Sequence, residues 1–380
     1  MKGSIKLRGS HWAYVVDIGR DPITGKRKQK TRGGFKRKKD AQAALNKLLV
    51  EIDDNKYVNP SNETFSKFIE RWFTEHFQKR IGDTTASNKR YLMYKHLIKE
   101  NPFAQKEMSK ITTEDIDSYY SLKIDEGYKA SYIRKMHQML KQVFEQAIRW
   151  KKLSSNPVVN AVSPAIKKEE MKIWSPQEII TFLQYCRGEY HRITFLLAIY
   201  TGMRRGEILG LKWSDIDYEK KTIKINRSLA YTPETKYIFT TLKTKNAKRE
   251  IPIPQLLLDE LINHQEHQQI WKDRLGDEYQ EQGFVVCTKQ GSAQDPRNVL
   301  RVMNRLVNAA EITRIRFHDL RHTHASILIS EGVDIVKVAH RLGHANPKIT
   351  LETYAHLIPN QDNEVADIFL SALNRSVSKL

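Results

Sequence analysis

Two segments that contain proline, the first polar and the second of mixed charge, divide this chain of 380 residues into three parts with different hydrophobic patterns. Residues 53–62 read DDNKYVNPSN, and residues 156–173 read NPVVNAVSPAIKKEEMKI. Such segments favour linkers, because proline cannot continue a helix and polar stretches bury little apolar surface. The sequence therefore predicts three domains, which span residues 1–57, 64–157 and 172–380.

The first part combines a strand pattern with a dense positive charge. Residues 1–40 contain 13 lysines and arginines against three aspartates, a surplus of ten that makes up half of the net charge of +20. The runs SIKLR, HWAYVVDIG and KRKQKTR are separated by turn residues at Gly9-Ser10 and at residues 21–25. Apolar residues then recur at helical spacing over residues 41–52. We expect a three-stranded sheet braced by one helix.

The basic strands have a shape that fits DNA, because the major groove admits a two-stranded β-ribbon. Runs of like charge usually form a solvated surface, but here the aromatic residues Trp12 and Tyr14 lie among the charges. We therefore expect this face to contact DNA. The candidate contact residues are Trp12, Tyr14, Lys26, Arg27, Lys28, Lys30 and Arg32. The pI of about 9.7 also favours a polyanionic partner, nucleic acid before an anionic membrane surface.

Several observations favour a cytoplasmic protein. The longest apolar runs, such as FLLAIY at 195–200, are far shorter than the roughly 20 residues of a membrane span. The N-terminus has no apolar stretch of signal-peptide length before its first charges. The two cysteines, Cys186 and Cys287, form no CxxC pair and fit a reducing compartment.

The second and third parts are mainly helical. In residues 64–155 apolar residues recur at i, i+3 and i+4, which predicts an all-α domain of four or five helices with an aromatic core. The third part opens a helix at Ser175-Pro176-Gln177-Glu178 and contains short strands only over residues 221–254. The expected fold is multidomain and mainly α: a small three-stranded β-sheet plus helix, an all-α domain, and a mixed, mostly α domain with a small β-sheet.

Four motifs followed by a tyrosine stand out in the third part. They are TGMRRGE at 201–207, a lysine-rich hairpin near 243, HDLRHTH at 318–324, LGH at 342–344, and Tyr354 ten residues after His344. Each motif alone also has an ordinary structural explanation. Arg204 and Glu207, three residues apart, are typical of a surface ion pair. The histidine pairs at i, i+4 could hold a metal ion, but no cysteine or carboxylate cluster accompanies them and HExxH is absent.

Taken together and in this order, the motifs resemble the tyrosine recombinase (phage integrase) family, with the catalytic motifs over about residues 174–358. The helical block resembles that family's core-site DNA-binding domain. The basic N-terminal unit resembles the arm-site DNA-binding domain of integrases from phages and integrative conjugative elements. The resemblance implies a site-specific recombinase in a bacterial host cell. It would cleave and rejoin DNA through a 3′-phosphotyrosine, to integrate and excise a mobile element.

The resemblance also implies the catalytic residues. They are Arg204, Lys243, His318, Arg321, His344 and Tyr354. Lys243, Lys245 and Lys248 all lie near the hairpin tip, and the family's Lys-Thr step maps best to Lys243. Glu207 is assigned to orienting the arginine side of the site.

The residue types suit the chemistry. A tyrosine can store the bond energy of the cleaved strand as a phosphotyrosine, and two arginines can hold the charged phosphate oxygens bidentately. The resemblance implies that Lys243 donates a proton to the leaving 5′ oxygen. His318 is the candidate for accepting the proton of Tyr354 or bonding the phosphate, and His344 for a second phosphate bond. No metal ion or cofactor is expected.

The expected partners are double-stranded DNA with core and arm attachment sites, and other copies of the chain in a homotetramer on DNA. An excisionase or a DNA-bending protein is an open further partner. An amphipathic helix over residues 362–373 either covers its own domain or docks on a neighbouring protomer. Two other functions remain open: a DNA-binding protein that has lost catalysis, and a metal-dependent nuclease that uses the histidines.

Overall fold

The computed structural model describes residues 3–20, 27–53, 62–166, 171–234, 236–241 and 247–357. The chain forms two compact units, Met1–Lys168 and Glu169–Leu380, which divide within the second expected linker. The boundaries of three domains stay a prediction. The turn at 21–25, Lys26, Lys243, Lys245 and the helix expected over 362–373 lie outside the described residues. Across the part that is described, no helix is both long and apolar enough to cross a membrane.

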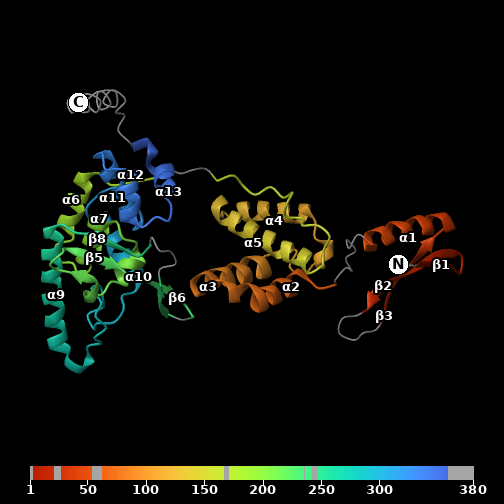
Figure 1. Cartoon of the computed structure of the whole chain (residues 1–380), viewed down its shortest axis with the longest axis horizontal. Helices are drawn as coiled ribbons and strands as arrows, with labels where there is room; N and C mark the ends of the chain where they lie inside the picture. Colours follow the sequence, from red (N-terminus) through yellow and green to blue (C-terminus); the bar gives the residue numbers. More distant parts are fainter. Residues whose placement is uncertain are drawn as a thin grey trace, which may run out of the picture. The chain divides into compact units, whose positions relative to one another are not determined.

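The N-terminal part of the first unit is an antiparallel sheet with one helix packed on it (Figure 1). Its elements are β1 (Gly3–Arg8), β2 (His11–Arg20), β3 (Arg27–Phe35) and α1 (Lys38–Asp53). This confirms the expected sheet and helix. Tyr14 and Val16 of β2 and Leu45 and Leu48 of α1 form the core between them.

Tyr14 was expected to contact DNA, and the structure corrects this. The side chain is only 2% exposed, and its ring lies 6.0 Å from that of Phe35, between the sheet and α1. A buried ring has no surface to offer to DNA. Trp12 stays partly exposed, with the ammonium of Lys38 5.5 Å from the centre of its ring.

The rest of the first unit is helical. Its α-helices are α2 (Phe65–Trp72), α3 (Asp83–Leu92), α4 (Thr113–Asp125) and α5 (Ala130–Arg149). Two π-helical segments, Phe73–Phe77 and Met93–Lys99, continue α2 and α3. The hydrophobic core gathers residues of all these segments, including the fully buried Leu140. The all-α expectation is confirmed.

Part of the second expected linker packs onto this helical core. Val158 is fully buried in it, and the backbone N–H of Val162 donates to Asp117 on α4 at 2.9 Å. Thr113 likewise donates its hydroxyl proton to the carbonyl oxygen of Pro157 at 2.9 Å. The valines in this stretch were the signal that it would not be fully solvated.

The second unit contains two small sheets together with its helices, and the strand β6 lies at its edge (Figure 1). Its helices are α6 (Pro176–Tyr185), α7 (Arg192–Thr201), α8 (Arg205–Leu209), α9 (Gln255–Leu275), α10 (Pro296–Ala309), α11 (Asp319–Ser330), α12 (Ile335–Leu342) and α13 (Pro347–Tyr354). Its strands are β4 (Ile216–Asp217), β5 (Thr222–Ile225), β6 (Arg227–Thr232), β7 (Lys236–Thr241) and β8 (Arg249–Pro252). The order β4-β5-β8 makes one antiparallel sheet, and β6-β7 makes a hairpin.

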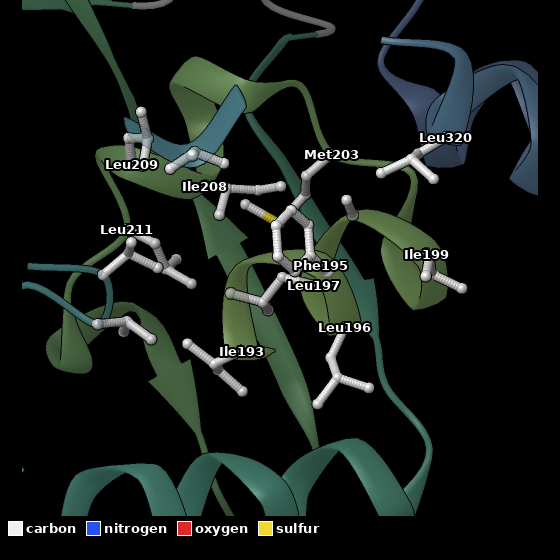
Figure 2. Packing of buried hydrophobic residues seen from close by; sticks show 14 of the residues in the cluster. Ile193, Phe195, Leu196, Leu197, Ile199, Met203, Ile208, Leu209, Leu211 and Leu320 are labelled. Atoms are coloured by element: carbon white, nitrogen blue, oxygen red, sulfur yellow. The ribbon is translucent and has the colours of Figure 1, made fainter. Parts of the chain in front are cut away.

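The core of the second unit is built around α7, whose sequence RITFLLAIYT is apolar on every side. A helix of this kind is stable only when other elements cover it all round. Figure 2 shows Phe195 and Leu197 of α7 beside Met203 and Ile208, with Leu320 of α11 at the edge of the same core. The end of α7 and the starts of α8 and α11 are thereby fixed relative to one another.

Leu140→Ala tests the core of the helical part. We expect it to lower the free energy of unfolding by about 2–5 kcal/mol, because it removes a fully buried side chain and leaves a cavity. Hydrogen exchange of peptides from α5 in the full chain measures this. The matched control is Leu122→Ala on α4, where Leu122 is 38% exposed and the expected change is about 0.5 kcal/mol or less. Equal effects of the two substitutions would contradict the described packing.

Candidate active site

Tyr354 is the last residue of α13, a helix that begins at Pro347 after the side-chain cap of Asn346. Its side chain is only 1% exposed. The phenol oxygen lies 2.5 Å from Nδ1 of His322 on α11. Burial raises the pKa of Tyr354 to about 12, although the positive charge of Arg321 acts against this rise. The tyrosine is therefore held in place as a neutral phenol.

Arg321 joins three of the motifs through backbone carbonyl groups. Its side chain is buried on α11, and its Nη1 donates to the carbonyl oxygen of Gly202 at 2.9 Å. Its Nη2 donates to the carbonyl oxygen of Leu342 at 2.6 Å. These carbonyls lie at the C-terminal ends of α7 and α12, where the helix dipole favours a cation. Burial and the nearby Arg204 lower the pKa of Arg321.

The glycine at the end of α7 is required by this junction. Gly202 has a φ of +65°, in the left-handed region that side chains disfavour. A Cβ atom there would also lie 2.8 Å from side-chain carbons of His324 and Leu342. Only glycine allows the chain to turn here and to present its carbonyl oxygen to Arg321.

Arg204 lies beside the same junction, at the N-terminal end of α8. Its Nη1 donates to Glu207 at 2.8 Å and its Nη2 to the carbonyl oxygen of Gly343 at 3.4 Å. The side chain is 39% exposed, so part of the guanidinium stays accessible to a ligand. Arg204 and Glu207 do pair, but not as the surface pair that their spacing suggested: Glu207 is 1% exposed, and Arg204 is the extended residue that precedes α8.

Glu207 also pairs with Arg249 of β8, and each of these side chains is 1% exposed. Two hydrogen bonds, of 2.9 Å and 3.2 Å, join the guanidinium to the carboxylate. Burial alone would raise the pKa of Glu207, but Arg249, assisted by Arg204, outweighs it and holds this pKa below its ordinary value. Arg249 Nε also donates to the carbonyl oxygen of Arg341 at 2.8 Å, which ties β8 to the end of α12.

The two predicted histidines have different surroundings. His318 is exposed and precedes α11, and its ring lies 5.1 Å from that of His322 at a right angle. His344 is half-buried, and its Nδ1 lies 2.7 Å from the hydroxyl oxygen of Thr350. Burial, together with Arg321 and Arg204, lowers the pKa of His344 to about 4.

The structure thus brings Arg204, Glu207, Arg321 and Tyr354 into one cationic region. His318 and His344 lie in the same region, because each interacts electrostatically with Arg204 and Arg321. Among the described residues no three His, Cys, Asp or Glu side chains gather as a metal ion would require. The i, i+4 histidines face other groups: His322 faces Tyr354, and His344 faces Thr350.

The remaining predicted residues belong to β3 and to the lysine-rich hairpin. Arg27, Lys30 and Arg32 lie on β3, and Arg27 pairs with Asp17. Lys28 lies on the same strand, but its side chain is outside what is described. Of the three hairpin lysines, only Lys248 falls among the described residues, and it is exposed.

Two residues of the site were missed by the sequence reasoning. His322 was considered only as a metal ligand, although its place in HDLRHTH, one turn after His318, puts it beside the same site. Arg249 precedes Ile251 and Ile253 at alternate positions, and this period of two predicts that all three face the core. A charged residue on that face requires a buried partner.

A cluster of arginines and neutral histidines around a buried phenol suits one kind of ligand. The guanidinium groups can hold a phosphodiester, because their planar donors match phosphate oxygens. The phenol then lies where it could attack the phosphorus atom. The arrangement is that of a nucleophile with preorganised stabilisation of a developing negative charge.

Comparison with known proteins agrees with this chemistry. The phage integrase family matches residues 174–361, and the arm DNA-binding domain matches residues 4–52. A "Tyrosine recombinase XerC-like" of Caldanaerobacter subterraneus subsp. tengcongensis is 31% identical over 381 residues, which cover 96% of both chains. The ICEBs1 integrase of Bacillus subtilis is 27% identical over 95% of this chain and 97% of its own.

Solved structures share the fold. The Tn1549 transposon integrase in complex with transposon right end DNA has a TM-score of 0.69 at 18% identity, over 82% of this chain and all of that one. A lambda integrase tetramer bound to a Holliday junction has a TM-score of 0.56 at 20% identity, over 94% of this chain and 95% of that one. At such identities the likeness concerns the fold.

Arg249→Met tests the buried ion pair. It leaves the Glu207 carboxylate buried with Arg204 as its remaining cation, so we expect the free energy of unfolding to fall by about 3 kcal/mol. Urea denaturation of the full chain measures the change. In the control, Arg305→Met breaks a pair with Glu189 in which the arginine is 59% exposed, and the expected loss is about 1 kcal/mol or less. A loss no larger than in the control would show that the buried pair does not stabilise the site.

Proposed function

The chain belongs to the phage integrase family of tyrosine recombinases, and we propose that Tyr354 cleaves and rejoins DNA strands through a 3′-phosphotyrosine link. As an enzyme of this family it recombines DNA. Integration is the reaction that its relatives' names indicate, and we propose that it both integrates and excises a mobile genetic element. The observation that carries the assignment to Tyr354 is the position of this buried phenol beside Arg321.

A covalent intermediate explains how strands are rejoined without an external energy source. Attack of the phenol on phosphorus forms a phosphotyrosine and releases the 5′ oxygen of the DNA. The energy of the phosphodiester is kept in the new bond, so a later attack by a DNA hydroxyl group reverses the step. The place of Tyr354 at the end of a short helix fixes the nucleophile relative to the arginines.

Arg204 and Arg321 are assigned to the phosphate oxygens. Arg321 is already oriented by the carbonyl groups of Gly202 and Leu342, so little reorganisation is needed when charge develops in the transition state. Arg204 is more exposed and offers its remaining donors to the incoming strand. Glu207, which is paired with Arg249, accepts a hydrogen bond from Arg204 and so orients its guanidinium.

The remaining assignments follow the family resemblance. Lys243, outside the described residues, would protonate the leaving 5′ oxygen. His318, exposed at the start of α11, and His344, beside Thr350, would donate hydrogen bonds to the phosphate. These roles need no metal ion or cofactor, because charge stabilisation and proton transfer are both supplied by side chains.

The partners that we propose are DNA attachment sites of core and arm type, and a homotetramer that forms on them in the bacterial cytoplasm. The match of residues 4–52 to the arm DNA-binding domain supports a second DNA contact. The lambda integrase tetramer on a Holliday junction supports the assembly. An excisionase or a DNA-bending protein is a further partner that such an assembly could take.

Formation of a covalent adduct tests the function of Tyr354. The probe is a duplex built from the sequence that the chain itself selects from a random DNA pool, nicked so that a cleaved strand diffuses away. In EDTA the wild type should give a denaturation-resistant protein–DNA adduct, and Tyr354→Phe should give none, because only a phenol oxygen can form the link. Gel electrophoresis measures both.

The other outcomes separate the alternatives. Binding of the selected duplex without an adduct would indicate a DNA-binding protein that has lost catalysis. Hydrolysis that depends on added divalent metal would indicate the nuclease. An adduct that persists in Tyr354→Phe would show that another residue is the nucleophile.

The basic strands can be tested by the salt dependence of DNA binding. Each phosphate neutralised contributes about 0.9 to the slope of log affinity against log salt. We expect replacement of Arg27, Lys30 and Arg32 by alanine to reduce this slope by about 1–3. The control, Lys47→Ala, removes an exposed charge from α1 and should leave the slope unchanged. An unchanged slope in the triple variant would show that β3 does not contact DNA.

A further inference from the structure

We propose that His322 takes the proton from Tyr354 when its phenol attacks DNA, and returns it when the strand is rejoined. This inference rests on the proposed function, because it assigns the proton of the nucleophile in that reaction. It moves the role of proton acceptor from His318, where the sequence placed it, to a histidine one turn later.

The first argument is the contact itself. The phenol oxygen of Tyr354 lies 2.5 Å from Nδ1 of His322, and the two rings are 5.8 Å apart and tilted by 50°. Among the described residues, His322 is the side chain that hydrogen-bonds this oxygen. The phenol O–H donates to Nδ1 when the imidazole carries its proton on Nε2. A proton acceptor needs this geometry, with the acceptor atom within hydrogen-bond reach of the proton.

The second argument is that His318 is placed differently. His318 is exposed and precedes α11, and its ring lies 5.1 Å from that of His322 at a right angle. His322 is thus in contact with both the exposed histidine and the buried phenol. The exposed His318 is placed to donate a hydrogen bond to the incoming phosphate. The half-buried His322 is placed to accept the proton of the nucleophile.

The third argument concerns the charges around His322. Burial, together with His318, Arg321 and Arg316, lowers the pKa of His322 to about 4, while Asp319 acts against them. His344, from the segment between α12 and α13, also interacts electrostatically with this ring. The imidazole is therefore neutral near pH 7, and its lone pair is available to the phenol.

The proton and the bonds balance in the proposed step. As the bond from the Tyr354 oxygen to phosphorus forms, its O–H bond breaks and the proton moves to Nδ1 of His322. The bond from phosphorus to the 5′ oxygen of DNA breaks, and this oxygen takes a proton from the separate donor assigned to Lys243. The products are a phosphotyrosine, a 5′ hydroxyl group, an imidazolium ion and a neutral lysine amine.

Rejoining is the reverse. The 5′ hydroxyl group attacks the phosphotyrosine, its proton returns to the lysine, and the bond from phosphorus to the tyrosine oxygen breaks. The imidazolium Nδ1–H then gives its proton back to that oxygen. Both the neutral and the charged histidine are used once in each cycle, so no outside acid or base is consumed.

Single-turnover cleavage of the nicked duplex described above tests this assignment. His322→Gln should slow adduct formation at least about 100-fold, because glutamine can accept a hydrogen bond but cannot hold the proton. The wild-type rate should rise with pH through one ionisation and then level off. In the variant this ionisation should disappear, and the rate should rise continuously towards the pKa of the phenol. His340→Gln, an exposed histidine on α12, is the control and should match the wild type.

A purely structural role is distinguished by chemical rescue. Free imidazole should restore adduct formation to His322→Ala but not to Tyr354→Phe. A His322→Gln variant that is slow but keeps the wild-type pH profile, with no rescue of His322→Ala by imidazole, would reduce His322 to a positioning residue and overturn the proposal. Wild-type rates in His322→Gln would overturn it as well.

Failure of the proposed function would give a different result, because the wild type itself would then form no adduct. If the His322 variants do not fold, a measurement on the wild type still tests the role of His322. Nitrogen NMR of labelled histidine should show Nδ1 of His322 unprotonated in the free wild-type chain at pH 7, as a proton acceptor requires. A protonated Nδ1 there would overturn the proposal.

Discussion

The site depends on the two hydrogen bonds by which Arg321 holds the ends of α7 and α12 together. The carbonyl oxygens of Gly202 and Leu342 come from segments 140 residues apart in sequence, yet both bind one buried guanidinium. These carbonyls lie at helix ends, where their partial negative charge stabilises the buried cation. Because Arg321 also lies one turn after His318, which precedes α11, the same junction fixes where the groups proposed to bind phosphate lie relative to Tyr354.

Positive charge is concentrated here with only partial compensation. Glu207 lies between Arg204 and Arg249, and its buried carboxylate orders the two guanidiniums. Arg321 is held by neutral carbonyl groups instead, so its charge is left to act on its surroundings. This field is one reason why His344 and His322 are neutral near pH 7. A phosphodiester would supply the missing negative charge, which is why DNA is the ligand that this region suits.

The sequence predicted the parts of the site that depend on local pattern. Arg204 and Glu207 share a helix face by spacing alone, and the motif order was sufficient to identify the family. It could not predict which face of β2 the helix α1 covers, and for this reason Tyr14 was placed on the wrong side. Nor could it show that His322 meets the phenol of Tyr354. That contact depends on the packing of α13 against α11, between residues 32 positions apart.

The charges of the site link the binding of DNA to the state of the nucleophile. Without DNA, burial and the nearby positive charges keep His322 neutral, and burial keeps the proton on Tyr354, so the phenol is a weak nucleophile. A bound phosphate would cancel part of the positive field and raise the pKa of His322. In the proposed mechanism the proton acceptor therefore becomes stronger when the phosphate that the phenol attacks is bound.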